Sequence, residues 1–378
     1  MKIAMFYHSL VSDWNHRNAH FLRGIVSELL SRGHEVEVYE PANGWSLRNL
    51  LDEHGVEPIR RFTQSYGLSS NLYDPATLDL DEALDGADLA VVHEWNDHDL
   101  VKRIGAHRNG MKSYRLLFHD THHRCVTDPE AIGAYDLRHY DGVLACGRVI
   151  RDIYLEKSWA RKAWTWHEAA DTRVFHPLCL AESEKAGQVV WIGNWGDEER
   201  TAELREFFIE PVRELKLKAQ AYGVRYPEYA LAALAEAAID YRGWIANYHV
   251  PEVFARFRVT VHIPRRPYVD LLPGIPTIRP FEALACGIPL VCSRWEDVEG
   301  LFYPGRDYLV ARSGREMKCH LEAVLHDPGL ASDLASSGLR TILSRHTCSH
   351  RVEELLRIYN ELEKEPNDRE KGPHVRRP

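Results

Sequence analysis

Hydrophobic and polar positions near the start of the chain follow two different periods. Residues 2–7 form a short apolar run typical of a buried strand, and residues 19–31 repeat apolar side chains at helical spacing. Gly33 follows this expected helix, and residues 35–39 alternate as a second strand does. The order strand, helix, strand predicts a βαβ unit with parallel strands.

The same alternation continues through the rest of the chain. We predict further strands at residues 89–93, 116–119, 143–145, 188–192, 218–221, 240–241, 259–263 and 290–292. Helices are expected from about residue 198 and over residues 349–364, where apolar side chains recur at helical spacing. Strands that alternate with helices in both halves predict an α/β fold with two Rossmann-like domains.

Length and composition agree with two globular domains. The chain has 378 residues, 44% hydrophobic and 27% charged, which is long for one hydrophobic core. A net charge of −9 and the lack of a dense Lys/Arg block argue against binding to nucleic acid or anionic lipid mainly by charge. Residues 365–378 combine proline, mixed charge and no apolar period, so we expect a disordered tail there.

Cysteine usage and the absence of targeting signals predict a cytoplasmic protein. The seven cysteines are scattered without a C-x-x-C pair, which is typical of a reducing compartment. The first residues lack the apolar core and cleavage site of a secretory signal. The longest apolar stretches, such as residues 283–292, are shorter than the roughly 20 residues that span a bilayer.

Residues 274–293, GIPTIRPFEALACGIPLVCS, predict a loop, a short helix and a buried strand in succession. Pro280 suits the first turn of a helix, which therefore begins near Arg279. Free N–H groups at a helix start can hold a diphosphate, and the Arg279 guanidinium adds a forked donor. The expected cradle consists of Thr277, Ile278, Arg279 and Phe281. Glu282 either accepts the hydroxyls of a ribose or merely balances the helix dipole.

The core of this segment resembles a known signature. Residues 279–287, R-P-F-E-A-L-A-C-G, resemble the donor-binding signature of the two-domain GT-B glycosyltransferases, especially the spore maturation protein CgeB-like family. The phrase RGHEVEVYEP at residues 32–41 is similar to the opening of many GT-B enzymes, and EAADTRVFHP at residues 168–177 is similar to their interdomain linker.

The resemblance implies two Rossmann-like domains that face a central cleft. The N-terminal, acceptor-side domain is expected over residues 1–175, and the nucleotide-sugar-binding domain over residues 176–348. The helix over residues 349–364 is expected to cross back to the first domain.

The resemblance also implies a reaction: transfer of a sugar from a nucleoside-diphosphate sugar to an acceptor hydroxyl, with UDP or dTDP expected and with no cofactor or metal. Retaining relatives show E-x7-E, but Gly274 occupies the earlier position here, so retention is favoured by resemblance alone. The acceptor is open among a small metabolite, a glycan, a protein and modified DNA. Alternatives are a GT-B sugar-nucleotide epimerase and a non-catalytic nucleotide-binding module. A nicotinamide dehydrogenase is disfavoured because no strand precedes G-x-G-x-x-G.

Loops after strands of the second half are candidates for the donor site, because ligands collect beyond the carboxyl ends of parallel strands. Gly193 and Asn194 begin the phrase G-N-x-x-x-E-R, which resembles the CgeB-like group and ends at Arg200. We expect Arg200 to contact a phosphate, although an exposed arginine at a helix start is the alternative. Gly223 and Trp244 follow two short strands, where the base is expected; core packing explains the tryptophan nearly as well.

Loops after strands of the first half supply acceptor-side candidates. Asp13 and His16 follow the first strand, where a helix N-cap is the simpler explanation of the aspartate. His93 and Glu94 follow a buried strand and suit a cleft wall, with surface solvation as the alternative. His122 belongs to the polar cluster FHDTHHR at residues 118–124 and is a further acceptor-side candidate.

The catalytic candidates lie in that same cluster. The resemblance implies a histidine after this strand that faces the donor sugar, and we assign this role to His119, with Asp120 beside it to fix the tautomer or the acceptor. A metal site formed with His122 and His123 is the alternative, but a dependable zinc site needs four ligands at recognised spacings. A structural histidine bonded to the backbone is a further alternative.

Overall fold

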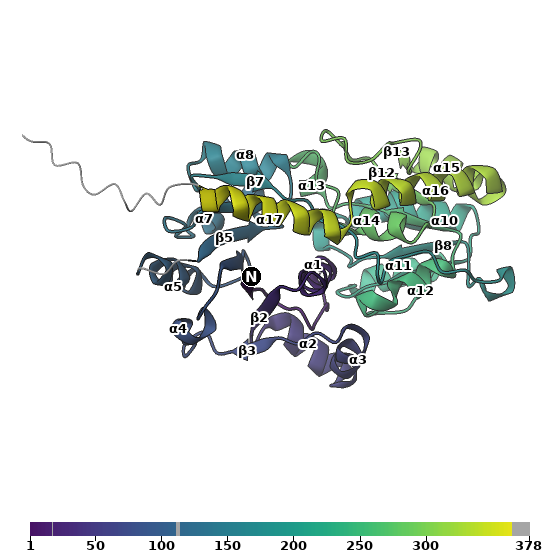
Figure 1. The fold of residues 1–378 in the computed structure, drawn as a ribbon. Helices are drawn as coiled ribbons and strands as arrows, with labels where there is room; N and C mark the ends of the chain where they lie inside the picture. Colours follow the sequence, from purple (N-terminus) through teal and green to yellow (C-terminus); the bar gives the residue numbers. More distant parts are fainter. Residues whose placement is uncertain (17, 111–113, 365–378) are drawn as a thin grey trace, which may run out of the picture.

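Two parallel β-sheets, each flanked by helices, form the molecule (Figure 1). The computed structural model describes residues 1–16, 18–110 and 114–364. The tail expected over residues 365–378 lies outside these described residues. Within the described ranges, no helix is both long and apolar enough to cross a membrane.

The first sheet has the strand order β3-β2-β1-β4-β5-β6-β7, and all of its pairs are parallel. Its strands are β1 Lys2–Phe6, β2 Glu35–Pro41, β3 Asn71–Tyr73, β4 Leu89–His93, β5 Arg115–Asp120, β6 Gly142–Ala145 and β7 Ala163–Thr165. The central strands β1, β4 and β5 are buried almost throughout, as expected for a parallel sheet covered on both faces.

Helices of the first domain cover both faces of this sheet (Figure 1). They are α1 Ala19–Ser31, α2 Trp45–His54, α3 Glu57–Tyr66, α4 Leu80–Ala83, α5 His98–Asn109, α6 Arg124–Thr127, α7 Pro129–Gly133 and α8 Arg148–Glu156. Helix α1 has the predicted bounds, because its apolar positions recur on one face and Phe21, Leu22 and Ile25 are buried in the core.

The second sheet has the order β10-β9-β8-β11-β12-β13 and is also parallel. Its strands are β8 Val189–Ile192, β9 Ala219–Tyr222, β10 Asp240–Tyr241, β11 Val259–His262, β12 Leu290–Ser293 and β13 Leu309–Ala311. Its helices are α9 Thr201–Leu204, α10 Glu210–Glu214, α11 Glu228–Glu236, α12 Val250–Ala255, α13 Arg266–Asp270, α14 Ile278–Ala285, α15 Gly314–His326 and α16 Pro328–Arg345. The α/β prediction is confirmed in both halves.

The helix expected from about residue 198 is interrupted. A 3₁₀ turn over Asp197–Glu199 is separated from α9 by Arg200, which has φ −149° and ψ 1° and therefore leaves the helical region. A π-helical turn over Arg205–Ile209 then joins α9 to α10. The helix is therefore interrupted at the residue whose guanidinium donates hydrogen bonds to loop carbonyls.

The last helix, α17 Cys348–Lys364, returns to the first domain and packs against α1 (Figure 1). Arg115 Nε on β5 donates to Glu363 Oε1 at 2.6 Å, and Trp166 Nε1 donates to the carbonyl of Arg351 at 2.9 Å. The first sheet ends at Thr165 and the second begins at Val189. The linker between these residues and α17 together connect the two sheets and leave a cleft between their carboxyl ends.

Candidate functional site

Three cavities meet where the carboxyl ends of the two sheets face each other. They have volumes of about 520, 100 and 80 Å³, and we call them the large cavity, the arginine cavity and the glycine cavity. Asn194, directly after β8, lines all three, and its amide Nδ2 donates to Asn15 Oδ1 of the first domain. The three spaces are therefore neighbouring parts of one interdomain cleft.

The arginine cavity lies at the start of α14. Its walls are Trp191, Ile192, Asn194, Arg200, His262, Arg265, Tyr268, Thr277, Ile278 and Arg279. Thr277 precedes Ile278, the first residue of α14, one position before the predicted start near Arg279, and its Oγ1 is hydrogen-bonded to His262 Nε2 at 3.0 Å. Burial, together with Arg200 and Arg279, lowers the pKa of His262 to about 3, so this histidine is neutral. Positive charge at this helix start therefore comes from the arginines and the helix dipole.

Arg200 is buried and bonds the backbone. Its guanidinium donates to the carbonyls of Ile263 at 3.0 Å, Trp195 at 3.3 Å and Asn194. Burial and the neighbouring Arg265 lower its pKa to about 9. No carboxylate in the described residues forms an ion pair with it, so a bound anion would relieve the repulsion among the arginines. Arg200 is therefore not the exposed arginine of the alternative interpretation, and its contact with a phosphate stays a prediction.

Arg279 forms an ion pair with Glu282 in the first turn of α14. Glu282 is fully buried, and its Oε1 also accepts a hydrogen bond from Asn247 Nδ2 at 2.7 Å and lies 3.2 Å from His20 Nδ1. Burial raises the pKa of Glu282, but Arg279 and His20 outweigh it and lower the value. Glu282 lines none of the three cavities, so the arrangement here orients Arg279. A ribose would have to displace Asn247 or His20.

Gly193, Gly223 and Trp244, which the sequence analysis assigns to the donor site, all line the glycine cavity. Gly223 has φ +146°, and a Cβ there would overlap the carbonyl of Gly193, so only glycine fits. The Trp244 ring lies 4.6 Å from that of His54 on α2, and its Nε1 has no hydrogen-bond partner among the described residues. An indole at the rim of a slot built of glycine backbone suits a planar base.

Asp13 lines the glycine cavity and connects the domains. Its Oδ2 accepts from Arg23 at 2.8 Å and from the backbone N–H of Asn247 at 2.9 Å. Its carboxylate does not cap α1, whose N-cap residue is Asn18. His16 lines both the glycine cavity and the large cavity, which places these two predicted residues at the junction of the domains.

The large cavity has a mostly uncharged wall. The first domain contributes Trp14, Asn15, His16, Asn18, Trp45, Asn49, Trp95, Thr121 and His122, and the second contributes Asn194, Arg225 and Arg265. The loop after β1 is fixed by Glu40 of β2, whose carboxylate accepts from Ser9 Oγ and from the N–H groups of Leu10 and Val11. This support holds Trp14 and its neighbours at the cavity.

His119 and His93 do not line these cavities. His119 is fully buried within β5, its Nδ1 hydrogen-bonded to Tyr7 Oη at 2.6 Å and its ring 4.8 Å from that of Trp166. Burial lowers its pKa to about 3. The expectation that His119 faces the donor sugar therefore needs correction in position: β5 extends to Asp120, and His122 reaches the large cavity. His93 is likewise buried, with its Nε2 3.1 Å from Thr121 Oγ1.

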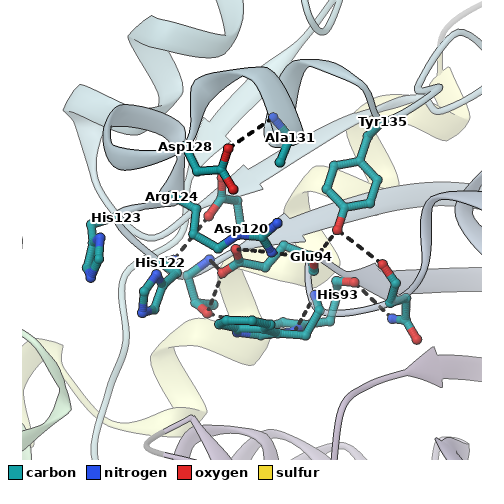
Figure 2. Close-up of polar contacts among 12 residues, drawn as sticks. His93, Glu94, Asp120, His122, His123, Arg124, Asp128, Ala131 and Tyr135 are labelled. Carbon is teal, nitrogen blue, oxygen red and sulfur yellow. Dashed lines mark hydrogen bonds and ion pairs between the residues drawn. The ribbon is translucent and has the colours of Figure 1, made fainter. Parts of the chain in front are cut away.

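The carboxyl groups of Glu94 and Asp120 lie next to each other (Figure 2). Both are fully buried. Glu94 Oε1 accepts from the N–H and Oγ1 of Thr121 at 2.9 and 3.1 Å, while Asp120 accepts from the N–H of His122 and from Tyr154. Burial and the Asp120 carboxylate raise the pKa of Glu94 well above its usual value. These carboxyls hold the loop that presents His122, and neither lines a cavity.

Phe281 also lies away from the cavities. Its ring packs against those of Phe302 and His346, at centroid distances of 5.2 and 5.6 Å. Because side chains around one helical turn point in different directions, Phe281 faces the core while Ile278 and Arg279 line the arginine cavity. No group of three or more His, Cys, Asp or Glu side chains among the described residues is placed to hold a metal ion.

Sequence reasoning missed most of the large cavity. Trp14, Trp45, Asn18 and Asn49 come from segments that only the tertiary fold brings together. Arg265 lines both the arginine cavity and the large cavity. Its position after a predicted strand was a signal for an anion-binding residue. A signal existed for Trp95 as well, because it follows β4 beside His93 and Glu94.

Comparison with known proteins supports this architecture. A family model described as "Glycosyl transferase-like" matches residues 200–357, whereas no curated protein matches the chain. An α-glucosyltransferase in complex with UDP-glucose and DNA containing an abasic site is similar in structure, with a TM-score of 0.72 at 14% identity over 95% of this chain and 99% of that one.

Two further solved structures are similar. HepE from Anabaena in complex with UDP-glucose has a TM-score of 0.65 at 13% identity, over 96% of this chain and all of that one. Sucrose-phosphate synthase from Thermosynechococcus elongatus has a TM-score of 0.64 at 13% identity, over 96% of this chain and 99% of that one. The predicted fold, two Rossmann-like domains in the GT-B arrangement, is confirmed. The closer resemblance to CgeB-like proteins stays a prediction.

Proposed function

We propose that the protein is a GT-B glycosyltransferase, related to the CgeB-like group, that transfers a sugar from UDP- or dTDP-sugar to an acceptor hydroxyl. The observation that carries this proposal is the arginine cavity. Three guanidinium groups and the start of α14 surround a space of about 100 Å³ at the carboxyl edge of the second sheet. A bound pyrophosphate would act as the anionic partner of the buried Arg200 guanidinium, which forms no ion pair with a carboxylate of the described residues.

The neighbouring cavities then place the two ends of the donor. The base enters the glycine cavity, where Gly223 allows close approach and Trp244 offers a stacking face. The sugar lies toward the large cavity, because Asn194 and Arg265 line both that cavity and the arginine cavity, which holds the diphosphate. The acceptor hydroxyl approaches from the large cavity.

Charge at the arginine cavity serves the chemical step. When the bond between the anomeric carbon and the phosphate oxygen breaks, negative charge grows on the diphosphate, and preorganised guanidinium groups stabilise it without a metal ion. The new bond forms from the acceptor oxygen to the anomeric carbon, and the acceptor proton passes to the departing phosphate oxygen. We propose retention, which the resemblance to retaining GT-B enzymes favours.

Calorimetric titration with UDP, dTDP, GDP and ADP tests the donor site. We expect either UDP or dTDP to bind most tightly of the four. The corresponding nucleotide sugar should then release its nucleoside diphosphate when an acceptor is added. Absence of binding by every nucleotide would contradict the proposal. Interconversion of the donor sugar without acceptor would identify an epimerase, and binding without turnover a non-catalytic module. The anomeric coupling constant of the product decides between retention and inversion.

A further inference from the structure

Three indole rings from separate segments gather at the large cavity. Trp14 follows β1, Trp45 begins α2 and Trp95 follows β4. Trp95 remains 38% exposed, although Arg124 lies over its ring at 4.9 Å. Aromatic faces carry partial negative charge and attract the partially positive C–H groups of a ring that lacks its own charge. The cavity therefore offers apolar faces to a ligand with C–H surfaces.

Between these rings the wall carries side-chain amides. An amide both donates and accepts hydrogen bonds, as a hydroxyl does. Asn18 is 2% exposed and lines the cavity, yet its Oδ1 has no hydrogen-bond partner among the described residues. A buried acceptor without a partner lowers stability, so this oxygen points to a ligand that donates a hydrogen bond here.

Charge at the cavity disfavours an anionic ligand. The first-domain wall contains no Asp, Glu, Lys or Arg among its described residues. Of the two arginines that the second domain contributes, Arg225 lies 3.2 Å from Asp197 and Arg265 lies 3.0 Å from Glu199. A nucleic acid is bound largely through cations that neutralise its phosphates, and the described residues of the first-domain wall do not form such a surface.

From these three features we propose that the acceptor is a neutral saccharide, a glycan end or an oligosaccharide, bound in the large cavity with a ring face against Trp95 and a hydroxyl on Asn18. A cavity of about 520 Å³ has room for more than the hydroxyl group that reacts. This inference rests on the proposed transfer reaction and specifies which of the open acceptor classes the enzyme takes.

The test first establishes the bound nucleotide by calorimetry and then measures acceptor-dependent release of diphosphate from its sugar. The panel contains methyl glucoside, maltose, cellobiose, chitobiose, a tyrosine-containing peptide and a double-stranded DNA oligonucleotide. We expect at least one saccharide to accelerate release and the peptide and DNA to have no effect. If the nucleotide binds but only peptide or DNA accelerates release, or no saccharide does, this inference is overturned. If no nucleotide binds, the proposed function itself has failed.

Substitution of Trp95 locates the saccharide. We expect Trp95→Ala to raise the acceptor KM by roughly tenfold, while the affinity for the nucleotide and the melting temperature stay unchanged. Trp95→Phe keeps a ring face and should recover most of the loss. Tyr303→Ala removes another exposed aromatic side chain, outside the large cavity, and serves as the control. An unchanged KM in Trp95→Ala would contradict the placement.

Discussion

The arginine cavity and the large cavity adjoin each other, yet they are built from different kinds of side chain. The first is lined by three arginines and the start of α14, and the second mainly by indoles, amides and imidazoles. Charge suits a diphosphate, which is the same for every nucleotide-sugar donor, whereas neutral faces suit an acceptor whose shape must be distinguished. Under the proposed function, this difference corresponds to donor binding by the second domain and acceptor recognition by the first.

Removing Arg279 should give the largest effect on the charged side of this comparison. We expect Arg279→Ala to weaken UDP binding by about 2–3 kcal/mol through the lost charged hydrogen bonds. It should also lower the free energy of unfolding by about 3 kcal/mol, because the buried Glu282 loses its countercharge. Calorimetry and urea unfolding measure the two effects.

A double variant separates these two losses. Arg279→Ala with Glu282→Gln should recover most of the stability but none of the affinity. Arg294→Ala, an exposed arginine of the same domain, is the matched control and should change neither quantity. Recovery of UDP affinity in the double variant would contradict the role of Arg279 in holding the diphosphate.

Substitution of Gly223 tests whether the proposed donor site depends on backbone shape at the glycine cavity as well as on the charge of the arginines. Gly223→Ala should lower stability by about 2–3 kcal/mol and abolish UDP binding, since its Cβ would displace the Gly193 carbonyl. Gly243→Ala also requires a positive φ, +71°, but meets no atom within 4 Å, so it should cost about 1 kcal/mol and leave binding intact. Equal stability and equal UDP affinity in the two variants would contradict a role for the Gly223 backbone in binding the donor.

His119 and His122, two of the histidines of the first domain, test the acceptor side of the comparison. His119→Ala should lower the free energy of unfolding by about 2 kcal/mol, because it leaves a cavity beside Trp166 and deprives Tyr7 of its partner. His122→Ala should leave the melting temperature nearly unchanged and reduce turnover. Thermal unfolding and single-turnover rates on the same samples distinguish them. The reverse pattern would restore His119 as the residue that faces the sugar.

The pH dependence of stability concerns the buried carboxyls of Glu94 and Asp120. Because the pKa of Glu94 is raised in the folded state, the folded protein binds more protons than the unfolded chain, and stability falls as pH rises above the unfolded value of about 4.3. Glu94→Gln keeps an acceptor for Thr121 and should flatten this fall, by about 1.4 kcal/mol for each unit of the raised pKa. Urea unfolding from acidic to neutral pH measures it. Parallel profiles for both proteins would contradict the assignment.

The helix at the arginine cavity could be predicted from the sequence because the residues that define its start are neighbours in the chain. Proline spacing and small residues predicted a helix from near Arg279, and α14 begins at Ile278. The role expected of Glu282 could not be checked in the same way, since its partners Asn247 and His20 come from distant segments. Local spacing finds a helix end, but the contacts of a buried carboxylate depend on the packing of both domains.

The acceptor side was less readable because it depends on strand ends and on loops brought together by the fold. The sequence predicted a strand ending at His119, but β5 runs to Asp120 and encloses that histidine in the sheet. One residue of strand length changes which side chain leaves the sheet edge. The indoles of Trp14, Trp45 and Trp95 carry no shared motif, and only the arrangement of three loops makes them one wall.

The most direct measurement of the central claim is a crystal structure of the protein with UDP bound. We predict the diphosphate in the arginine cavity, within hydrogen-bonding distance of Arg279 and Arg200, and the base in the glycine cavity beside Trp244. A diphosphate located elsewhere, or an empty arginine cavity at a saturating UDP concentration, would contradict the account.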